Sequence, residues 1–174
     1  MNAIVAADRR WAIGRNGGLL FSLPADMRRF RALTLGGTVI MGRLTLESLP
    51  GGRPLPRRRN IVVTRNPAAL PEGVEGAASP EEAVALAGGP EAEDLWVIGG
   101  GSIYAALLDQ CRRVFLTRVE AQAEDPDTFF PDLERLPNWE AASPGEPVEE
   151  NGLEFRFIEY VNTTPHNRTG EVKV

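Results

Sequence analysis

Short, continuous apolar segments alternate with helical patterns along most of this chain, and this alternation restricts the fold more than any other feature. Continuous apolar segments are typical of strands buried on both faces, as in parallel sheets. We expect such strands over residues 3–7, 38–42, 60–64, 95–100 and 113–121. We expect helices over residues 24–34, 43–49 and 101–110, and one between the N-cap Ser79 and Gly88. The predicted fold class is α/β: a single domain with a mostly parallel central sheet and helices on both faces.

The C-terminal part of the chain departs from this alternation. Residues 153–160, LEFRFIEY, alternate between apolar and polar side chains, as a half-exposed strand does. No helical pattern separates this segment from the preceding strands, so we expect an antiparallel pair at one edge of the sheet. We assign residues 1–160 to the domain and residues 161–174 to a polar, peripheral tail.

The composition, 43% hydrophobic and 25% charged residues, is ordinary for a soluble globular protein. No apolar run approaches the ~18 residues of a membrane span. The N-terminus lacks the basic residue and the long apolar run of a signal peptide. We therefore expect a cytoplasmic protein that does not contact a membrane.

The chain has one cysteine, Cys111, and one histidine, His166. An intrachain disulfide is therefore impossible. A histidine-activated nucleophile would depend on the polar tail, and a zinc site would have almost no nitrogen or sulfur ligands. We expect no metal site, so the chemistry must come from carboxylates, hydroxyls, arginines, backbone groups or a bound cofactor.

The net charge of −5 argues against a general nucleic-acid-binding protein, yet basic residues gather in one region. Six arginines and a single acid, Glu47, lie between Arg43 and Arg65. This cluster predicts a small anionic ligand. A second interpretation is a bias of composition, because Lys173 is the only basic residue of the chain that is not an arginine.

Two segments run from a predicted strand through glycine into a predicted helix: VIMGRLTLES at 39–48 and VIGGGSIY at 97–104. Such junctions let a phosphate approach the backbone, and ligands of open α/β sheets bind at the carboxyl ends of strands. The dinucleotide motif G-x-G-x-x-G fails at Tyr104. The two junctions predict a site for two phosphate-bearing parts of one cofactor, or they are tight turns that need glycine for conformation alone.

A carboxylate occupies an unexpected place in the predicted helix 24–34. On its helical wheel Leu23, Met27, Phe30 and Thr34 share one face, and Asp26 falls between Phe30 and Leu33, inside or at the edge of that apolar stripe rather than opposite it. One interpretation is a first-turn acid that complements the helix dipole. The other is a functional carboxylate in a pocket.

Four segments, in order, resemble bacterial dihydrofolate reductases: AIVAADRRWAIGRNGGLLFSLPADMRRFR, VIMGRLTLESLPGGRPLPRRRNIVVTRN, WVIGGGSIYAALL and DTFFPDL. The resemblance covers residues 2 to about 160. It implies hydride transfer from NADPH to 7,8-dihydrofolate, at pterin C6 with protonation at N5, to give the tetrahydrofolate of one-carbon metabolism. It also implies a monomer that binds antifolates.

The resemblance also implies roles for individual residues. Asp26, Phe21 and Leu19 match positions at the reacting centre, Asp26 as the single acid that holds the pterin. Arg58 matches the arginine that binds the α-carboxylate of the substrate's glutamate. The other substrate positions are Ile4, Val5, Ala6, Phe30, Leu49, Leu55, Ile98 and Thr117. For the aliphatic members of this set, core packing is the alternative interpretation.

On the cofactor side, the resemblance assigns Arg43 and Arg65 to the 2′-phosphate, which predicts a preference for NADPH over NADH. It also implies a cis Gly99–Gly100 peptide and a mobile loop over residues 8–22 that closes over the ligands. The full set of predicted cofactor-binding residues is Ala6, Ile13, Gly42, Arg43, Thr45, Thr64, Arg65, Gly99, Gly100, Gly101, Ser102, Ile103 and Tyr104.

One departure from the family concerns proton delivery: this chain has Leu20-Phe21 where many members have Pro-Trp, and phenylalanine lacks the indole N–H that can hold a water. Two other functions are alternative interpretations of the same sequence. One is a reductase of the same fold that acts on a riboflavin-pathway intermediate, against which Asp26 and Arg58 argue. The other is a non-catalytic dinucleotide-binding module, against which the intact acid argues.

Overall fold

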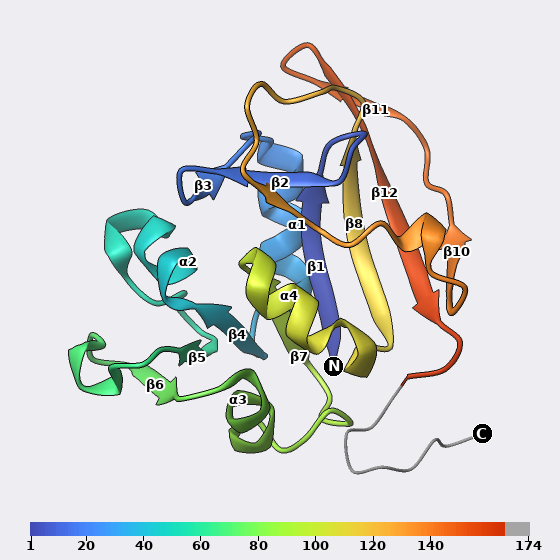
Figure 1. Ribbon diagram of the computed structural model, residues 1–174. Coiled ribbons are helices and arrows are strands. Elements are labelled where there is room, and N and C mark those ends of the chain that lie inside the picture. Colours follow the sequence, from blue (N-terminus) through green and yellow to red (C-terminus); the bar gives the residue numbers. More distant parts are fainter. Residues whose placement is uncertain (166–174) are drawn as a thin grey trace.

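A nine-stranded sheet runs through the molecule in this computed structural model, which describes residues 1–165 (Figure 1). Its strands lie in the order β10-β12-β8-β1-β7-β4-β5-β6, and β11 pairs with β12. They are β1 (Asn2–Ala7), β4 (Thr38–Gly42), β5 (Arg59–Val63), β6 (Val74–Ala77), β7 (Leu95–Gly99), β8 (Arg113–Val119), β10 (Trp139–Ser143), β11 (Val148–Glu150) and β12 (Leu153–Asn162).

Six neighbouring strands of this sheet, β8-β1-β7-β4-β5-β6, are parallel to one another, and β12 pairs with β8 in the antiparallel direction. The mostly parallel sheet with an antiparallel edge is therefore confirmed. β12 is longer than the predicted strand 153–160, since Val161 pairs with Arg113 and Asn162 with Trp139. Two residues assigned to the tail thus belong to the sheet. His166 and the rest of the predicted tail lie outside the described residues.

Helices cover both faces of this sheet, as predicted, with α4 in front of it and α1 behind it in Figure 1. Side chains of the strands alternate between two cores: one, with Val39 and Met41, packs against α1 and α2, and the other, with Ile40, packs against α3 and α4. The helices are α1 (Pro24–Thr34), α2 (Arg43–Ser48), α3 (Pro80–Leu86) and α4 (Gly101–Leu107), and 3-10 turns lie at Pro50–Gly52, Pro67–Ala69, Leu108–Gln110 and Leu133–Arg135.

The predicted helix over 101–110 is split, because its last turn, Leu108–Gln110, is a 3-10 turn. Within residues 1–165, no helix combines the length and the apolar character needed to cross a membrane.

A second, three-stranded sheet orders the loop that follows β1. It consists of β2 (Ala12–Arg15), β3 (Gly18–Leu19) and β9 (Thr128–Phe129), in the order β3-β2-β9. Asp8 fixes the base of this loop, because its carboxylate accepts hydrogen bonds from the backbone N–H groups of Arg10, Ala12 and Ala123. At the tip, the carboxylate of Asp127 accepts from the N–H of Asn16. The loop predicted over 8–22 is therefore anchored at its base and at its tip to the segment around residues 121–129.

Candidate active site

A large cleft lies at the carboxyl ends of β1, β4, β5 and β7, where the sequence placed the ligands. Its volume of about 1460 Å³ exceeds the roughly 300–1,000 Å³ typical of a site for one small ligand. Most residues predicted for the site line it: Ile4, Val5, Ala6, Ile13, Leu19, Phe21, Asp26, Phe30, Gly42, Arg43, Thr45, Leu49, Thr64, Arg65, Ile98, Gly99, Gly100, Gly101, Ser102, Ile103 and Tyr104. The cleft therefore has room for two ligands side by side.

Asp26 lies at one end of this cleft, in the first turn of α1. The hydroxyl of Thr117, on β8, donates a hydrogen bond of 2.5 Å to Asp26 Oδ1. Burial raises the pKa of the Asp26 carboxyl, while the Thr117 hydrogen bond and the positive charge of Arg29 act in the opposite direction. Thr117 does not line the cleft; it lies beneath Asp26 and holds one of its oxygens.

The start of α1 is fixed by a residue that sequence reasoning missed. Leu23, at the N-cap, makes no side-chain cap hydrogen bond. Instead, the carboxylate of Glu150, on β11, accepts from the N–H of Ala25 at 3.0 Å and lies 3.8 Å from a guanidinium nitrogen of Arg28. Glu150 is 125 residues from Ala25 along the chain, so no local pattern could have indicated this cap.

Apolar side chains surround Asp26 on the sheet side. Phe30, Leu49, Leu55 and Ile98 pack with Ile4 in one cluster, and Leu55 lies within that cluster rather than at the surface of the cleft. Met27, placed by the helical wheel on the apolar face, is 49% exposed and lines the cleft.

The two residues predicted beside Asp26 at the reacting centre differ in burial. Phe21 is partly buried and packs against the cluster of Leu23, Val119 and Phe155. Leu19, at the end of β3, is 68% exposed at the rim of the cleft.

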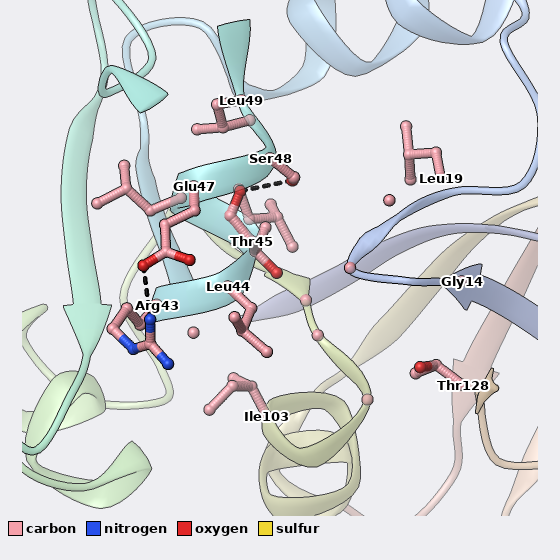
Figure 2. A pocket seen from close by; sticks show the side chains of 18 of the residues that line it. Gly14, Leu19, Arg43, Leu44, Thr45, Glu47, Ser48, Leu49, Ile103 and Thr128 are labelled. Carbon is pink, nitrogen blue, oxygen red and sulfur yellow. Dashed lines mark hydrogen bonds and ion pairs between the residues drawn. The ribbon is translucent and has the colours of Figure 1, made fainter. Parts of the chain in front are cut away.

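The glycine turn between β7 and α4 forms the other wall. The Gly99–Gly100 peptide is cis, as predicted, and Gly99 has a φ of 128°. A Cβ atom on Gly101 would lie only 2.7 Å from the methyl group of Thr128, so glycine is required there. Figure 2 shows Thr45 directed from α2 toward this turn. Its hydroxyl would lie 3.4 Å from a Cβ atom added to Gly99.

Tyr104 ties this wall to the central sheet. Its hydroxyl donates a 2.6 Å hydrogen bond to the carbonyl of Ile4, on β1. Because burial raises the pKa of Tyr104, the phenol remains protonated and keeps donating this bond. The helix that follows the glycine turn is thereby tied to β1.

The arginines of the predicted cluster differ in whether they line the cleft. Arg43 and Arg65 line the cleft, and Arg43 pairs with Glu47 at 2.5 Å, one helical turn later (Figure 2). Arg59 pairs with Glu75, away from the cleft lining. Arg58 does not line the cleft; its guanidinium donates to the hydroxyl of Thr34 and the carbonyl of Pro56.

The surroundings of Arg58 disfavour the charged form of its guanidinium. Partial burial and the nearby charge of Arg31 both lower the pKa of the Arg58 guanidinium. A carboxylate placed beside Arg58 would therefore relieve a local excess of positive charge.

Several residues that line the cleft had no prediction: Ser22, Leu44, Ser48 and Thr128. Ser48 lies three residues after the predicted Thr45 on α2, so the helical period could have indicated it, whereas Leu44 has no such spacing from a predicted residue of α2. Thr128 reaches the cleft because β9 pairs with β2, and the sequence carries no signal for that pairing.

Comparison with known proteins agrees with this geometry. The family model described as dihydrofolate reductase matches residues 1–162, which end where β12 ends. Dihydrofolate reductase type 3 of Salmonella typhimurium is 43% identical over 159 residues, covering 91% of this chain and 95% of the relative. The dihydrofolate reductase of Mycobacterium leprae (strain TN) is 41% identical over 152 residues, covering 85% and 89%. That of Bacillus subtilis (strain 168) is 35% identical over 159 residues, covering 90% and 91%. The chain belongs to the dihydrofolate reductase family, the enzymes that reduce dihydrofolate to tetrahydrofolate.

Proposed function

We propose that this protein reduces 7,8-dihydrofolate with NADPH, and that Asp26 holds the pterin ring during the reaction. The observation that carries this proposal is a single carboxylate in an otherwise apolar end of the cleft. The pterin presents two parallel donors, its 2-amino group and N3–H, and a carboxylate accepts two parallel hydrogen bonds. Thr117 supports this role, because its bond to Oδ1 restricts the rotation of the carboxylate.

The reduction needs a hydride at C6 and a proton at N5. A negative charge beside the ring favours the protonated form of N5, and positioned acid–base groups contribute about 10²–10⁴-fold to such reactions. We propose that Asp26 supplies this charge and that the proton reaches N5 through water. Phe21 and Leu19 line the cleft, and we propose that they limit the access of solvent to the bound pterin.

The residues of the opposite end fit a dinucleotide that carries phosphates. The glycines at 99–101 line the cleft with backbone groups alone, and Thr45 and Ser102 add hydroxyl groups. Arg43 and Arg65 offer positive charge for a 2′-phosphate, with Ala6, Ile13, Gly42, Thr64, Ile103 and Tyr104 completing the set. NADPH, when bound, supplies the hydride. The chain positions it against the pterin end of the cleft.

Arg58 is proposed to bind the α-carboxylate of the glutamate part of dihydrofolate. Its guanidinium donates to the Thr34 hydroxyl and does not line the cleft, and the nearby Arg31 adds positive charge. Because dihydrofolate extends from the pterin toward its glutamate, a carboxylate at this place would sit on a charge-assisted partner. We expect antifolates to occupy the same end of the cleft in competition with the substrate.

The test is NADPH oxidation by the purified protein, measured by loss of NADPH absorbance. We expect it to depend on dihydrofolate, to be inhibited by an antifolate, and to be absent when dihydrofolate is replaced by the aminopyrimidine intermediate of riboflavin synthesis. Oxidation that depends on the aminopyrimidine and not on dihydrofolate would refute the proposal.

A further inference from the structure

Arg29 lies one helical turn after Asp26, on the same side of α1. Its side chain is partly buried, unlike those of the neighbouring Arg28 and Arg31, which are exposed. No sequence pattern indicates a role for Arg29, and the cleft lining does not include it. A buried guanidinium needs a physical reason, because removing a cation from water is unfavourable unless other charges compensate.

Two aromatic rings hold the Arg29 guanidinium in place. Its central carbon lies 4.4 Å from the ring centroid of Phe157, on β12, and 5.6 Å from that of Phe115, on β8. Both distances are within the range of a cation–π contact. One terminal nitrogen, NH1, is buried and has no hydrogen-bond partner among residues 1–165. Packing on rings, rather than a bonded acid, therefore fixes the position of this cation.

The register of the sheet explains why Asp26 and Arg29 have different partners. Thr117 pairs with Phe157 across β8 and β12, and Phe115 pairs with Glu159 two residues away. Thr117 therefore meets Asp26, while the two rings meet Arg29. Glu159, on β12, is in turn paired with Arg113 at the exposed end of the strand. The signs of charge alternate from the cleft outward: Asp26, Arg29, Glu159, Arg113.

We propose that Arg29 is a positioning residue for the reaction: held between Phe115 and Phe157, it supplies the positive charge that keeps the partly buried Asp26 carboxylate ionised. This inference rests on the function proposed for Asp26. Its chemistry is electrostatic, since Arg29 does not line the cleft and does not touch the ligands.

The other groups around Asp26 do not supply this charge. Thr117 and Tyr104 are neutral, and Tyr104 is committed to the carbonyl of Ile4. Glu150, at the start of α1, is negative and lies near Arg28, which is exposed to solvent. Among the described residues, Arg29 is the cation whose charge lowers the pKa of Asp26 against the effect of burial. Asp26 and Glu159 in turn favour the charged form of Arg29.

The test is the titration of the Asp26 carboxyl in the ligand-free protein, followed by carbon-13 NMR of protein labelled at the aspartate carboxyl carbon. Loss of one signal in Asp26→Asn identifies the resonance. A close opposite charge lowers a carboxyl pKa by roughly 1–3 units, and the Arg29 guanidinium packs on rings rather than bonding Asp26, so we expect the pKa to rise by about one unit, the low end of that range, in Arg29→Met. Arg29→Lys restores charge and should return the pKa most of the way. Arg28→Met, which removes a cation from the exposed side of the same helix, is the matched control and should leave it unchanged.

A second variant covers the case in which Arg29→Met does not fold. Glu159→Gln removes the negative charge behind Arg29, so it should lower the pKa of Asp26. Equal pKa values in wild type and the Arg29 variants that fold, or a shift in Arg28→Met as large as in Arg29→Met, would overturn the proposal. So would an unchanged pKa in Glu159→Gln.

The titration needs no substrate, so this outcome is separate from the outcome for the reaction itself. With dihydrofolate, Arg29→Met should raise KM at a pH below the pKa measured for its Asp26 carboxyl, where that carboxyl is protonated, and leave KM unchanged at a pH well above it. A purely structural role would change KM at both pH values.

Discussion

The two ends of the cleft solve the problem of binding charge in different ways. Around Asp26, which we call the acid half, one partly buried carboxylate sits among Ile4, Phe30 and Ile98, and burial raises its pKa. Around Gly99–Gly101, the glycine half, open backbone and the exposed Arg43 and Arg65 face the cleft. A charge is energetically unfavourable in the acid half, where it is partly removed from water, and well solvated in the glycine half. Substitutions in the acid half should therefore change chemistry, and those in the glycine half should change cofactor affinity.

The largest expected effect comes from Asp26→Asn. The amide keeps the shape but cannot accept from both pterin donors, so turnover at pH 7 should fall at least ~100-fold. NADPH affinity should hardly change, because the glycine half is untouched. Asp132→Asn, at the start of a 3-10 turn outside the cleft, is the control. Comparable losses in turnover and NADPH affinity would mean that the two halves are not separate.

Arg58→Ala should weaken dihydrofolate binding and leave kcat near its wild-type value, because the reacting ring does not move. A hydrogen bond to a charged group contributes about 1.5–3 kcal/mol, so KM should rise by roughly one to two decades. Steady-state kinetics beside Arg59→Ala, whose guanidinium pairs with Glu75, provide the comparison. A normal KM in Arg58→Ala and a raised one in Arg59→Ala would move the role to Arg59.

In the glycine half, the double variant Arg43→Ala, Arg65→Ala should reduce the preference for NADPH over NADH by about tenfold or more, as expected for charge-assisted contacts of about 1.5–3 kcal/mol. Because Arg43 is already paired with Glu47, we expect Arg65→Ala alone to have the larger effect. Kinetics with both cofactors measure it. If the double variant keeps the full preference, these arginines do not read the 2′-phosphate.

The smallest expected effect is on stability, and its sign distinguishes the two interpretations of Asp26. Burial raises the pKa of Asp26 in the folded protein, so the folded state binds the proton more tightly than the unfolded chain. The resulting stabilisation is present below the unfolded-state pKa, near about 4, and is lost as pH rises through the folded-state pKa.

Above that pH the ionised carboxyl destabilises the fold, so Asp26→Asn should have a higher Tm than wild type at pH 8. The difference should shrink below pH 4, as thermal unfolding across pH can measure. If the carboxylate only complements the helix dipole, we expect the reverse: Asp26→Asn should lose about 0.3–1 kcal/mol of folding stability at pH 8.

Local sequence patterns predicted the features that depend on residues close together along the chain, such as helix caps and the limits of strands. The capping signal at Ser79 is confirmed, because the Ser79 hydroxyl accepts from the N–H of Glu82 and the Glu82 carboxylate accepts from the N–H of Ala78. The apolar segments became the central strands within one or two residues of the expected limits. Helical spacing placed Asp26 inside or at the edge of the apolar stripe, and it left open whether the acid serves the helix dipole or a pocket.

Contacts between distant segments account for most of what was missed. β2, β3 and β9 are two to four residues long and exist because they pair with one another, which no apolar period indicates. Glu150 and Arg29 gain their surroundings from β11, β8 and β12. One omission was avoidable, since the i, i+4 spacing of Arg43 and Glu47 predicts their ion pair.

The most direct test of the account is single-turnover hydride transfer, measured across pH for wild type and Asp26→Asn with NADPH already bound. If the charge of Asp26 promotes protonation of N5, the variant should be at least ~100-fold slower at pH 7 and should recover partly at low pH, where solvent protonates N5 without help. Wild-type hydride transfer by Asp26→Asn at pH 7, with the same pH profile, would contradict the account.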